Sequence, residues 1–279
     1  MIDSHTHSTA SDGRTPPELL LVEAKDAGLD MIGLTDHDTT GGWAAASSTV
    51  ITTGVALIRG IEMSTRFYGC SVHILGYLFN PDDVAMRAHM DKVRTARLER
   101  AKEFVARLAE DFPISWEDVV VETADGATVG RPHIADALVT AGVVPDRSTA
   151  FDQMLSPGTK YYVPHYAPSA PDAVEWITAA GGKAVFAHPR APMRGREVPD
   201  AAIAELAEAG LFGIEIDHRD NRADAIEFLE YSAQALQLAR FGASDYHGSG
   251  KPNRLGENTT SPSVIEALTQ GSALEVLYP

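Results

Sequence analysis

Apolar and polar positions alternate along the chain with two different periods. Short apolar runs rich in β-branched residues are separated by longer stretches in which apolar residues recur every three or four positions, the spacing of amphipathic helices. The runs that predict strands cover residues 1–7, 31–38, 55–64, 70–79, 183–188, 212–218 and 241–247. Strands that alternate with helices are typical of βα units around a parallel sheet, so the pattern predicts an α/β barrel of seven strands, one fewer than usual.

The helix after the first strand has signals at both ends. Thr15 is a candidate N-cap, Pro16 and Pro17 suit a first helical turn, and Gly28 is placed to end the helix. Similar helices are predicted over residues 170–180, 199–209 and 222–239. These helices fall between the predicted strands, as a barrel requires.

Residues 80–164 interrupt this alternation. A long charged helix is predicted from about Asp82 to Asp111, with one apolar stripe formed by Leu98, Ala101, Val105, Leu108 and Phe112. Its basic residues are interpreted as a solvated face, namely Arg87, Lys92, Arg94, Arg97, Arg100, Lys102 and Arg107. We therefore divide the chain into a barrel, residues 1–79 and 165–279, and a helical insertion, residues 80–164, that covers one mouth of the barrel as a lid or substrate subdomain.

Composition narrows the range of functions. The 279 residues are 44% hydrophobic and carry a net charge of −16, which repels long polyanions and excludes extended nucleic-acid binding. No run approaches the roughly 20 apolar residues of a membrane span, and the start lacks the pattern of a signal peptide. The single cysteine, Cys70, cannot form an internal disulfide, which agrees with a reducing compartment. We expect a cytoplasmic protein without a membrane partner.

Histidine and carboxylate residues follow the predicted strands. Asp3, His5 and His7 lie two positions apart, so on a strand they share one face and the two imidazoles can converge on one ion. The other six strands reach similar residues, which are Asp36, His37 and Asp38; Glu62; His73; His188; Glu215, Asp217 and His218; and Asp245 and His247. Active sites of parallel βα barrels form at the carboxyl ends of the strands, so we predict that these side chains meet in one site.

This set of side chains indicates a metal site. Imidazoles and carboxylates without a cysteine cluster suit Zn, Mn or Fe. The candidates outnumber the ligands of one ion, which indicates two or three divalent ions. Such ions turn a bridging hydroxide into a nucleophile near neutral pH and neutralise a phosphate ester, so hydrolysis of a phosphoester is the predicted chemistry.

In order along the chain, these residues resemble the motifs of the PHP (polymerase and histidinol phosphatase) family. The matching segments are Asp3-x-His5-x-His7, Ser11-Asp12-Gly13, Thr35-Asp36-His37-Asp38, Glu62, His73, Ala187-His188-Pro189 and Asp245-x-His247. They span nearly the whole chain. The resemblance implies a distorted (β/α)7 barrel and a metal-dependent phosphoesterase.

The resemblance also implies three metal positions. The first set of ligands is His5, His7, Glu62 and Asp245, the second is Asp12, His37 and His247, and the third is Glu62, His73 and His188. Glu62 would bridge two ions. Several family members have histidine where this chain has Asp12, and a carboxylate there favours Mn or Fe over Zn. Two interpretations stay open for Asp3 and Asp36, orientation of metal-bound imidazoles and capping of a helix or turn.

Residues 130–133, Gly-Arg-Pro-His, resemble a segment of the PHP subgroup that hydrolyses small nucleotides and the 5′ ends of short RNA. Arg131 can clamp a phosphate with two parallel hydrogen bonds, and His133 at a helix start can add another. The alternative for Arg131 is a surface residue before a helix. His218 is expected to contact phosphate or to donate a proton to the leaving oxygen.

Asp245, His247 and His218 are the residues that we expect to act in catalysis. His89 and His165 match no motif and are interpreted as structural.

The subgroup resemblance implies a substrate with two phosphates. We expect the enzyme to remove the 3′-phosphate of a nucleoside 3′,5′-bisphosphate, such as adenosine 3′,5′-bisphosphate, while Arg131 holds the spared phosphate. The alternative is a 5′–3′ exonuclease on short RNA, because an acidic enzyme can still bind a terminal phosphate and a base or two. A histidinol-phosphate phosphatase and a non-catalytic metal-binding module fit less well, since the Gly-Arg-Pro-His segment and all nine candidate ligands are present.

Overall fold

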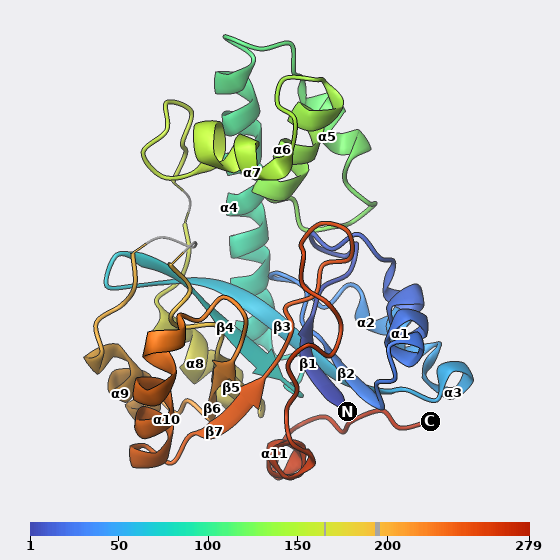
Figure 1. The fold of residues 1–279 in the computed structure, drawn as a ribbon, viewed down its shortest axis with the longest axis vertical. Coiled ribbons are helices and arrows are strands. Elements are labelled where there is room, and N and C mark those ends of the chain that lie inside the picture. Colours follow the sequence, from blue (N-terminus) through green and yellow to red (C-terminus); the bar gives the residue numbers. More distant parts are fainter. Residues whose placement is uncertain (165, 193–195) are drawn as a thin grey trace.

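A seven-stranded sheet organises the fold in the computed structural model, which describes residues 1–164, 166–192 and 196–279 (Figure 1). The strands lie side by side in chain order as β1 (Ile2–Thr6), β2 (Met31–Leu34), β3 (Ala56–Phe67), β4 (Cys70–Tyr77), β5 (Lys183–Phe186), β6 (Gly213–Asp217) and β7 (Ala239–Gly242). A parallel bridge between Thr6 and Tyr246 brings the two edges together, so the sheet is nearly closed. The predicted distorted seven-stranded barrel is confirmed.

One strand departs from the predicted parallel arrangement. β4 runs antiparallel to both β3 and β5, whereas the other neighbouring strands are parallel. Tyr68 and Gly69 form the tight turn between β3 and β4 with φ values of 49° and 72°, as a two-residue hairpin requires. The prediction that every strand carries its ligand at a carboxyl end is therefore wrong for these two strands. Glu62 and His73 lie within them, and the few residues between the two runs leave no room for a helical crossover.

Two groups of helices cover the outside of the sheet on opposite sides, and one more helix lies below it (Figure 1). They are α1 (Pro17–Asp26), α2 (Trp43–Ser47) and α3 (Val50–Thr53) on one side, α8 (Ala170–Ala179), α9 (Ala201–Glu208) and α10 (Ile226–Ala235) on the other, and α11 (Pro262–Thr269) below. A short 3-10 turn, η3 (Ala223–Ala225), precedes α10, and β7 begins where the predicted helix 222–239 would still continue.

The predicted signals at the two ends of α1 have different outcomes. Thr15 does not cap it, because Pro16 is the N-cap residue and the Thr15 hydroxyl donates to a Glu23 carboxylate oxygen at 3.0 Å instead. Gly28 follows the helix at φ 76°, the left-handed conformation that glycine adopts without strain, as predicted.

The insertion stands above the sheet (Figure 1). It contains α4 (Val84–Leu108), α5 (Trp116–Val121), α6 (Arg131–Thr140), α7 (Arg147–Ala150) and a π-helical turn, η1 (Phe151–Leu155). Its helices share a hydrophobic cluster of their own, while Met86 and Met90 near the start of α4 belong to the main cluster of the barrel. Ala101, Val105 and Leu108 of the predicted stripe are buried there, but Leu98 is 37% exposed and lies outside the cluster. The role of the insertion as a lid or substrate subdomain stays a prediction.

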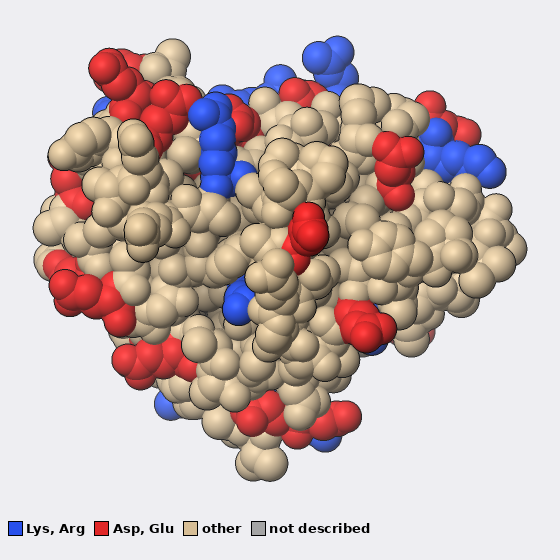
Figure 2. Space-filling model, turned by 90° about the horizontal axis from the view of Figure 1, so that it is seen from below, with Lys and Arg blue, Asp and Glu red and all other residues tan. Residues whose placement is uncertain are grey.

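Inside the barrel, an apolar layer lies on one side of the polar residues. Ile58 lies on the same face of β3 as Glu62, and Leu75 and Tyr77 lie on the same face of β4 as His73. α11 packs beneath this layer, and the molecule seen from that end carries acidic side chains around the face with few basic ones among them (Figure 2). Among the described helices, none is both long and apolar enough to cross a membrane.

Candidate metal centre

The nine predicted metal ligands lie together at one end of the barrel interior. They are His5 on β1, His7 and Asp12 in the loop after β1, His37 after β2, Glu62 on β3, His73 on β4, His188 after β5, and Asp245 and His247 after β7. All are buried except His73, which is 17% exposed. The structure thus brings together every side chain that the motifs singled out, although their roles as ligands stay predictions.

Glu62 lies between two groups of imidazoles. Its Oε2 atom is 3.1 Å from Nε2 of His7 and 3.1 Å from Nδ1 of His37. Its Oε1 atom is 2.6 Å from Nδ1 of His73 and 3.1 Å from Nε2 of His188. Because the two oxygens face different rings, this carboxylate has the geometry of a bridge between two cations.

The first predicted set converges on one point. Nε2 of His5 lies 3.0 Å from Nε2 of His7 and 3.4 Å from carboxylate oxygens of both Glu62 and Asp245. Nε2 of His7 is also 3.2 Å from the Asp245 oxygen. These four atoms form one of the groups whose spacing suits a shared ion.

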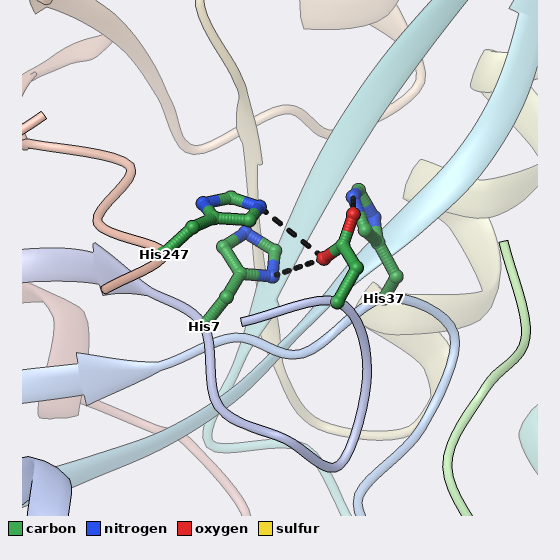
Figure 3. Close-up of side chains that lie close together, drawn as sticks. His7, His37 and His247 are labelled. Atoms are coloured by element: carbon green, nitrogen blue, oxygen red, sulfur yellow. Dashed lines mark ion pairs between the residues drawn. The ribbon is translucent and has the colours of Figure 1, made fainter. Parts of the chain in front are cut away.

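The second predicted set surrounds Asp12. Its carboxylate oxygens lie 3.2 Å from Nε2 of His247 and 3.8 Å from Nε2 of His37. Nδ1 of His7 is a further 3.8 Å contact, so His7 stands between the first and second sets (Figure 3). The three histidine rings in Figure 3 surround one carboxylate.

An observation of the structure itself indicates that these residues fit divalent cations. Buried polar atoms almost always have a partner, yet Nδ1 of His37, Oε2 of Glu62 and Nε2 of His247 make no hydrogen bond with any of the residues described. His247 gives the clearest case. Its Nδ1 lies 2.8 Å from a carbonyl oxygen, that of Asp245, so Nδ1 carries the ring proton and the lone pair of Nε2 faces the Asp12 carboxylate. A lone pair and an anion at this distance repel each other, and a cation between them would remove that repulsion.

The pKa shifts agree with this arrangement. Burial lowers the pKa of His7, but the carboxylates of Asp245 and Glu62 outweigh it and raise the pKa to about 9. Burial raises the pKa of Glu62, but the rings of His73, His37 and His5 outweigh it and hold that pKa well below its usual value. At His7 and Glu62, the centre therefore favours positive charge on the ring and negative charge on the carboxylate, which is what a cation site needs.

Asp3 and Asp36 fix the loops that carry the ligands. Asp36 accepts hydrogen bonds from the backbone N–H of Ser8 at 2.8 Å and from the hydroxyls of Ser8 and Ser11, both at 2.6 Å. The Ser11 hydroxyl lies 3.4 Å from Nδ1 of His7. Asp3 accepts from the backbone N–H groups of Ser244 and Gly256 in the loops after β7.

His218 has the opposite tautomer from His247. Nδ1 of His218 accepts a hydrogen bond from the backbone N–H of Asp220 at 3.1 Å, so the neutral ring carries its proton on Nε2. That atom is buried and lies 4.0 Å from a carboxylate oxygen of Asp245. Burial lowers the pKa of His218, so at neutral pH the ring is an uncharged hydrogen-bond donor at the edge of the centre.

The two predicted substrate contacts of the insertion differ in their surroundings. His133 is buried, and its Nδ1 accepts the backbone N–H of Gly130 at 3.1 Å, so the ring caps its own helix. Arg131 donates to the carbonyl of Leu155 at 3.2 Å, stacks over the ring of Phe151 and lines a large cavity next to the centre.

Two histidines matched no motif. His89 stacks on Trp176, in agreement with a structural role, and His165 lies outside the residues described.

Sequence reasoning missed several cationic groups near the centre. The interpretation of Arg97 and Arg100 as solvated is wrong, because both line the cavity of about 900 Å³, and Arg97 is 2.8 Å from a carboxylate oxygen of Asp38. Nζ of Lys251 lies 2.8 Å from Oδ2 of Asp245. The (i, i+3) spacing of the two arginines on α4 was a usable signal, and so was the position of Lys251, four residues after His247.

The chain is similar to several known proteins. The PHP domain model matches residues 3–83. The 3′,5′-nucleoside bisphosphate phosphatase of Chromobacterium violaceum is 32% identical over 280 residues, covering 100% of this chain and 98% of that protein. A 5′-3′ exoribonuclease of Haemophilus influenzae is 34% identical over 246 residues, covering 88% and 89%.

Solved structures show the same fold. A protein of Bifidobacterium adolescentis described as a metal-dependent phosphoesterase has a TM-score of 0.95 at 38% identity, covering 97% of this chain and 96% of its own. An amidohydrolase of Chromobacterium violaceum, with bound sulfate and no metal, has a TM-score of 0.87 at 32% identity, covering 100% and 98%.

Proposed function

Because the chain belongs to the PHP family of metal-dependent phosphoesterases, we propose that it removes the 3′-phosphate from nucleoside 3′,5′-bisphosphates. One observation carries the choice of a substrate with two phosphates. The cavity beside the centre is lined by predicted ligands such as His37 and His188 and by five arginines, Arg66, Arg97, Arg100, Arg131 and Arg196. In a protein with a net charge of −16, a cluster of arginines is unusual, and it is explained if the cluster binds a second anion of the substrate.

The attacked phosphate would lie at the centre. His5, His7, Asp12, His37, Glu62, His73, His188, Asp245 and His247 would hold two or three divalent ions. When bound, such ions supply a nucleophile from water near neutral pH and offset the charge of the phosphate. The Nε2–H group of His218 points toward Asp245 and is placed to donate a hydrogen bond to a phosphate oxygen. This geometry supports the phosphate contact over the proton donor, because a neutral imidazole N–H is a weak acid.

The spared phosphate would lie against the arginines. Burial lowers the pKa of Arg100 to about 9, and the neighbouring charges of Arg131, Arg97 and Arg66 contribute to the shift because they repel its guanidinium. An anion among them relieves that repulsion. The cavity of about 900 Å³ is within the size range of small-molecule sites, and aromatic residues such as Phe104 and Phe151 line it beside the arginines.

Substrate comparison with one variant tests this proposal. We expect adenosine 3′,5′-bisphosphate to be preferred over 3′-AMP in the protein assayed with Mn²⁺. Arg131→Ala should raise the KM for the bisphosphate about tenfold or more and bring its kcat/KM toward that of 3′-AMP, because the variant no longer holds the 5′-phosphate. Arg87→Ala is the control, since it also removes one arginine from the insertion, but Arg87 is 63% exposed and does not line the cavity. An unchanged KM in Arg131→Ala would show that this role is wrong.

The 5′–3′ exonuclease activity on short RNA is the second candidate, and the same cavity supports it. The first nucleotide of a 5′-phosphorylated RNA carries a 5′-phosphate and a 3′-phosphodiester, so it presents two anions with the spacing of a bisphosphate. The relative from Haemophilus influenzae is a 5′-3′ exoribonuclease. Faster release of nucleotides from a 5′-phosphorylated trinucleotide than of phosphate from the bisphosphate would favour this activity.

A further inference from the structure

Glu215 on β6 is a buried carboxylate outside the nine predicted ligands. Its side chain is completely inaccessible to solvent, at 0% exposure. A carboxylate at such a position needs hydrogen-bond donors, because burial without them costs several kcal/mol. Glu215 has two, and both belong to residues of the centre. Nδ1 of His5 lies 2.9 Å from Oε1, and the backbone N–H of His188 donates to Oε2 at 2.8 Å.

We propose that Glu215 is a positioning residue that sets the tautomer of His5 and the backbone of His188 for metal binding. This inference rests on the metal centre of the proposed function. A neutral imidazole has one N–H group. Since a carboxylate only accepts, the proton of His5 sits on Nδ1, and the lone pair of Nε2 is left to face Glu62 and Asp245.

The second hydrogen bond acts on the backbone. His188 has φ of 29°, a positive value that non-glycine residues adopt only under constraint. Its backbone N–H group donates a hydrogen bond to Glu215, while Nε2 of the same residue lies 3.1 Å from Oε1 of Glu62. Glu215 therefore holds one residue from each of two predicted ligand sets and couples the first set to the third.

Glu215, His5 and His188 also lie close enough together to share an ion, but the hydrogen bonds of Glu215 favour the positioning role. Each of its oxygens already accepts from a donor, and the N–H dipole of His188 directs positive charge at Oε2. The nitrogen of His5 that faces Glu215 is Nδ1, while the nitrogen that meets His7 and Asp245 is Nε2, on the other edge of the ring. A cation at the predicted first position would therefore have the His5 ring between itself and Glu215.

Glu215→Gln separates the contact with His5 from the contact with His188, because glutamine has the same shape as glutamate. Its amide oxygen must face the His188 N–H, which cannot reverse. The amide NH2 group then faces Nδ1 of His5, which must accept, and the proton moves to Nε2 where the cation would bind. We expect zinc affinity, measured by competition with a chromophoric chelator, to fall about ten- to hundredfold, the usual effect of losing such a partner.

Asp217→Asn is the matched control on the same strand. It also removes one negative charge, but the carboxylate of Asp217 is 38% exposed and paired with Arg240. We expect its zinc affinity and stoichiometry to equal those of the unchanged protein. Equal affinity in Glu215→Gln as well would overturn the proposal, and so would an equal loss in both variants, since the loss would then follow charge alone.

A measurement on the unchanged protein covers the case in which Glu215→Gln does not fold. Long-range ¹H–¹⁵N spectra of the zinc-loaded protein report which ring nitrogen of each histidine carries a proton. We expect a protonated Nδ1 and an unprotonated Nε2 for His5, assigned by the signal that disappears in His5→Gln. The reverse tautomer would refute the role of Glu215, whereas a protein that binds no zinc at all would refute the metal centre.

Discussion

Arg97 ties the insertion to the barrel, and its removal should cost a measurable part of the free energy of unfolding. Its guanidinium lies on α4 and donates from Nη1 to Oδ2 of Asp38 and to the hydroxyl of Ser64, both at 2.8 Å. Asp38 is 1% exposed and Arg97 12% exposed, so this ion pair is largely shielded from water. Arg97→Ala leaves the Asp38 carboxylate buried without its cation.

The expected loss of unfolding free energy depends on the hydrogen bonds that Asp38 keeps in the variant. Removing one partner of a buried ion pair costs about 3–5 kcal/mol. Asp38 keeps the N–H and hydroxyl of Ser64 as donors, both at 2.8 Å, so we expect a loss near the lower end, about 3 kcal/mol. Arg107→Ala is the control. Its pair with Glu103 is exposed on both sides, at 40% and 51%, and should contribute about 0.5 kcal/mol or less.

Urea unfolding followed by circular dichroism measures both losses. The protein is treated with a chelator first, because bound metal would stabilise the folded state and mask the difference. Arg97→Ala combined with Asp38→Asn should recover part of the loss, since no buried charge is then left unpaired. If Arg97→Ala unfolds at the same urea concentration as Arg107→Ala, the burial argument for this pair is incorrect.

Three further predictions concern the centre. Asp12→His should raise the share of zinc over manganese in protein purified without added metal, as metal analysis would show, and an unchanged ratio would contradict the hardness argument. His218→Gln should lower kcat about tenfold or more while metal content stays the same; loss of metal would instead make His218 a ligand. The metal-free protein should melt at the highest temperature near pH 6.5. Burial lowers the pKa of His247 to about 4, so the folded state loses stability as the pH falls from about 6.5 toward 4 and this ring must be protonated. Carboxylates raise the pKa of His7 to about 9, so the stability that its protonated ring contributes is lost as the pH rises from about 6.5 toward 9. Melting curves from pH 4 to 9 check this, and a flat profile would contradict it.

The sequence predicted the barrel and the gathering of the centre because both depend on short-range patterns. The period of apolar residues located seven strands, and parallel strands direct their carboxyl ends to the same side. His37, His188 and His247 follow β2, β5 and β7 in this way. Glu62 and His73 lie within an antiparallel hairpin. They meet the other side chains as predicted, but not because they lie at the carboxyl ends of parallel strands.

The surroundings of the centre could not be predicted in the same way, because they depend on contacts between distant parts of the chain. Arg97 reads as one more charged residue on an exposed helix, and only the packing of α4 against the loop after β2 places it beside Asp38. Glu215 was visible on its strand, but its partner His5 is 210 residues away. A pattern identifies which side chains are able to bind a metal, whereas the partners that orient them come from the tertiary structure.

His218 and His247 show why residue type alone does not assign a role. Both have an aspartate two residues away, and in both the backbone of that aspartate contacts Nδ1. In His247 the contact is a carbonyl oxygen of the preceding Asp245, whose φ is 55°, so Nε2 keeps its lone pair and can bind a cation. In His218 the contact is the N–H of the following Asp220, so Nε2 carries a proton and can only donate. The same side chain is thus suited to bind a cation in one loop and to donate a hydrogen bond in the other, and the backbone conformation determines which.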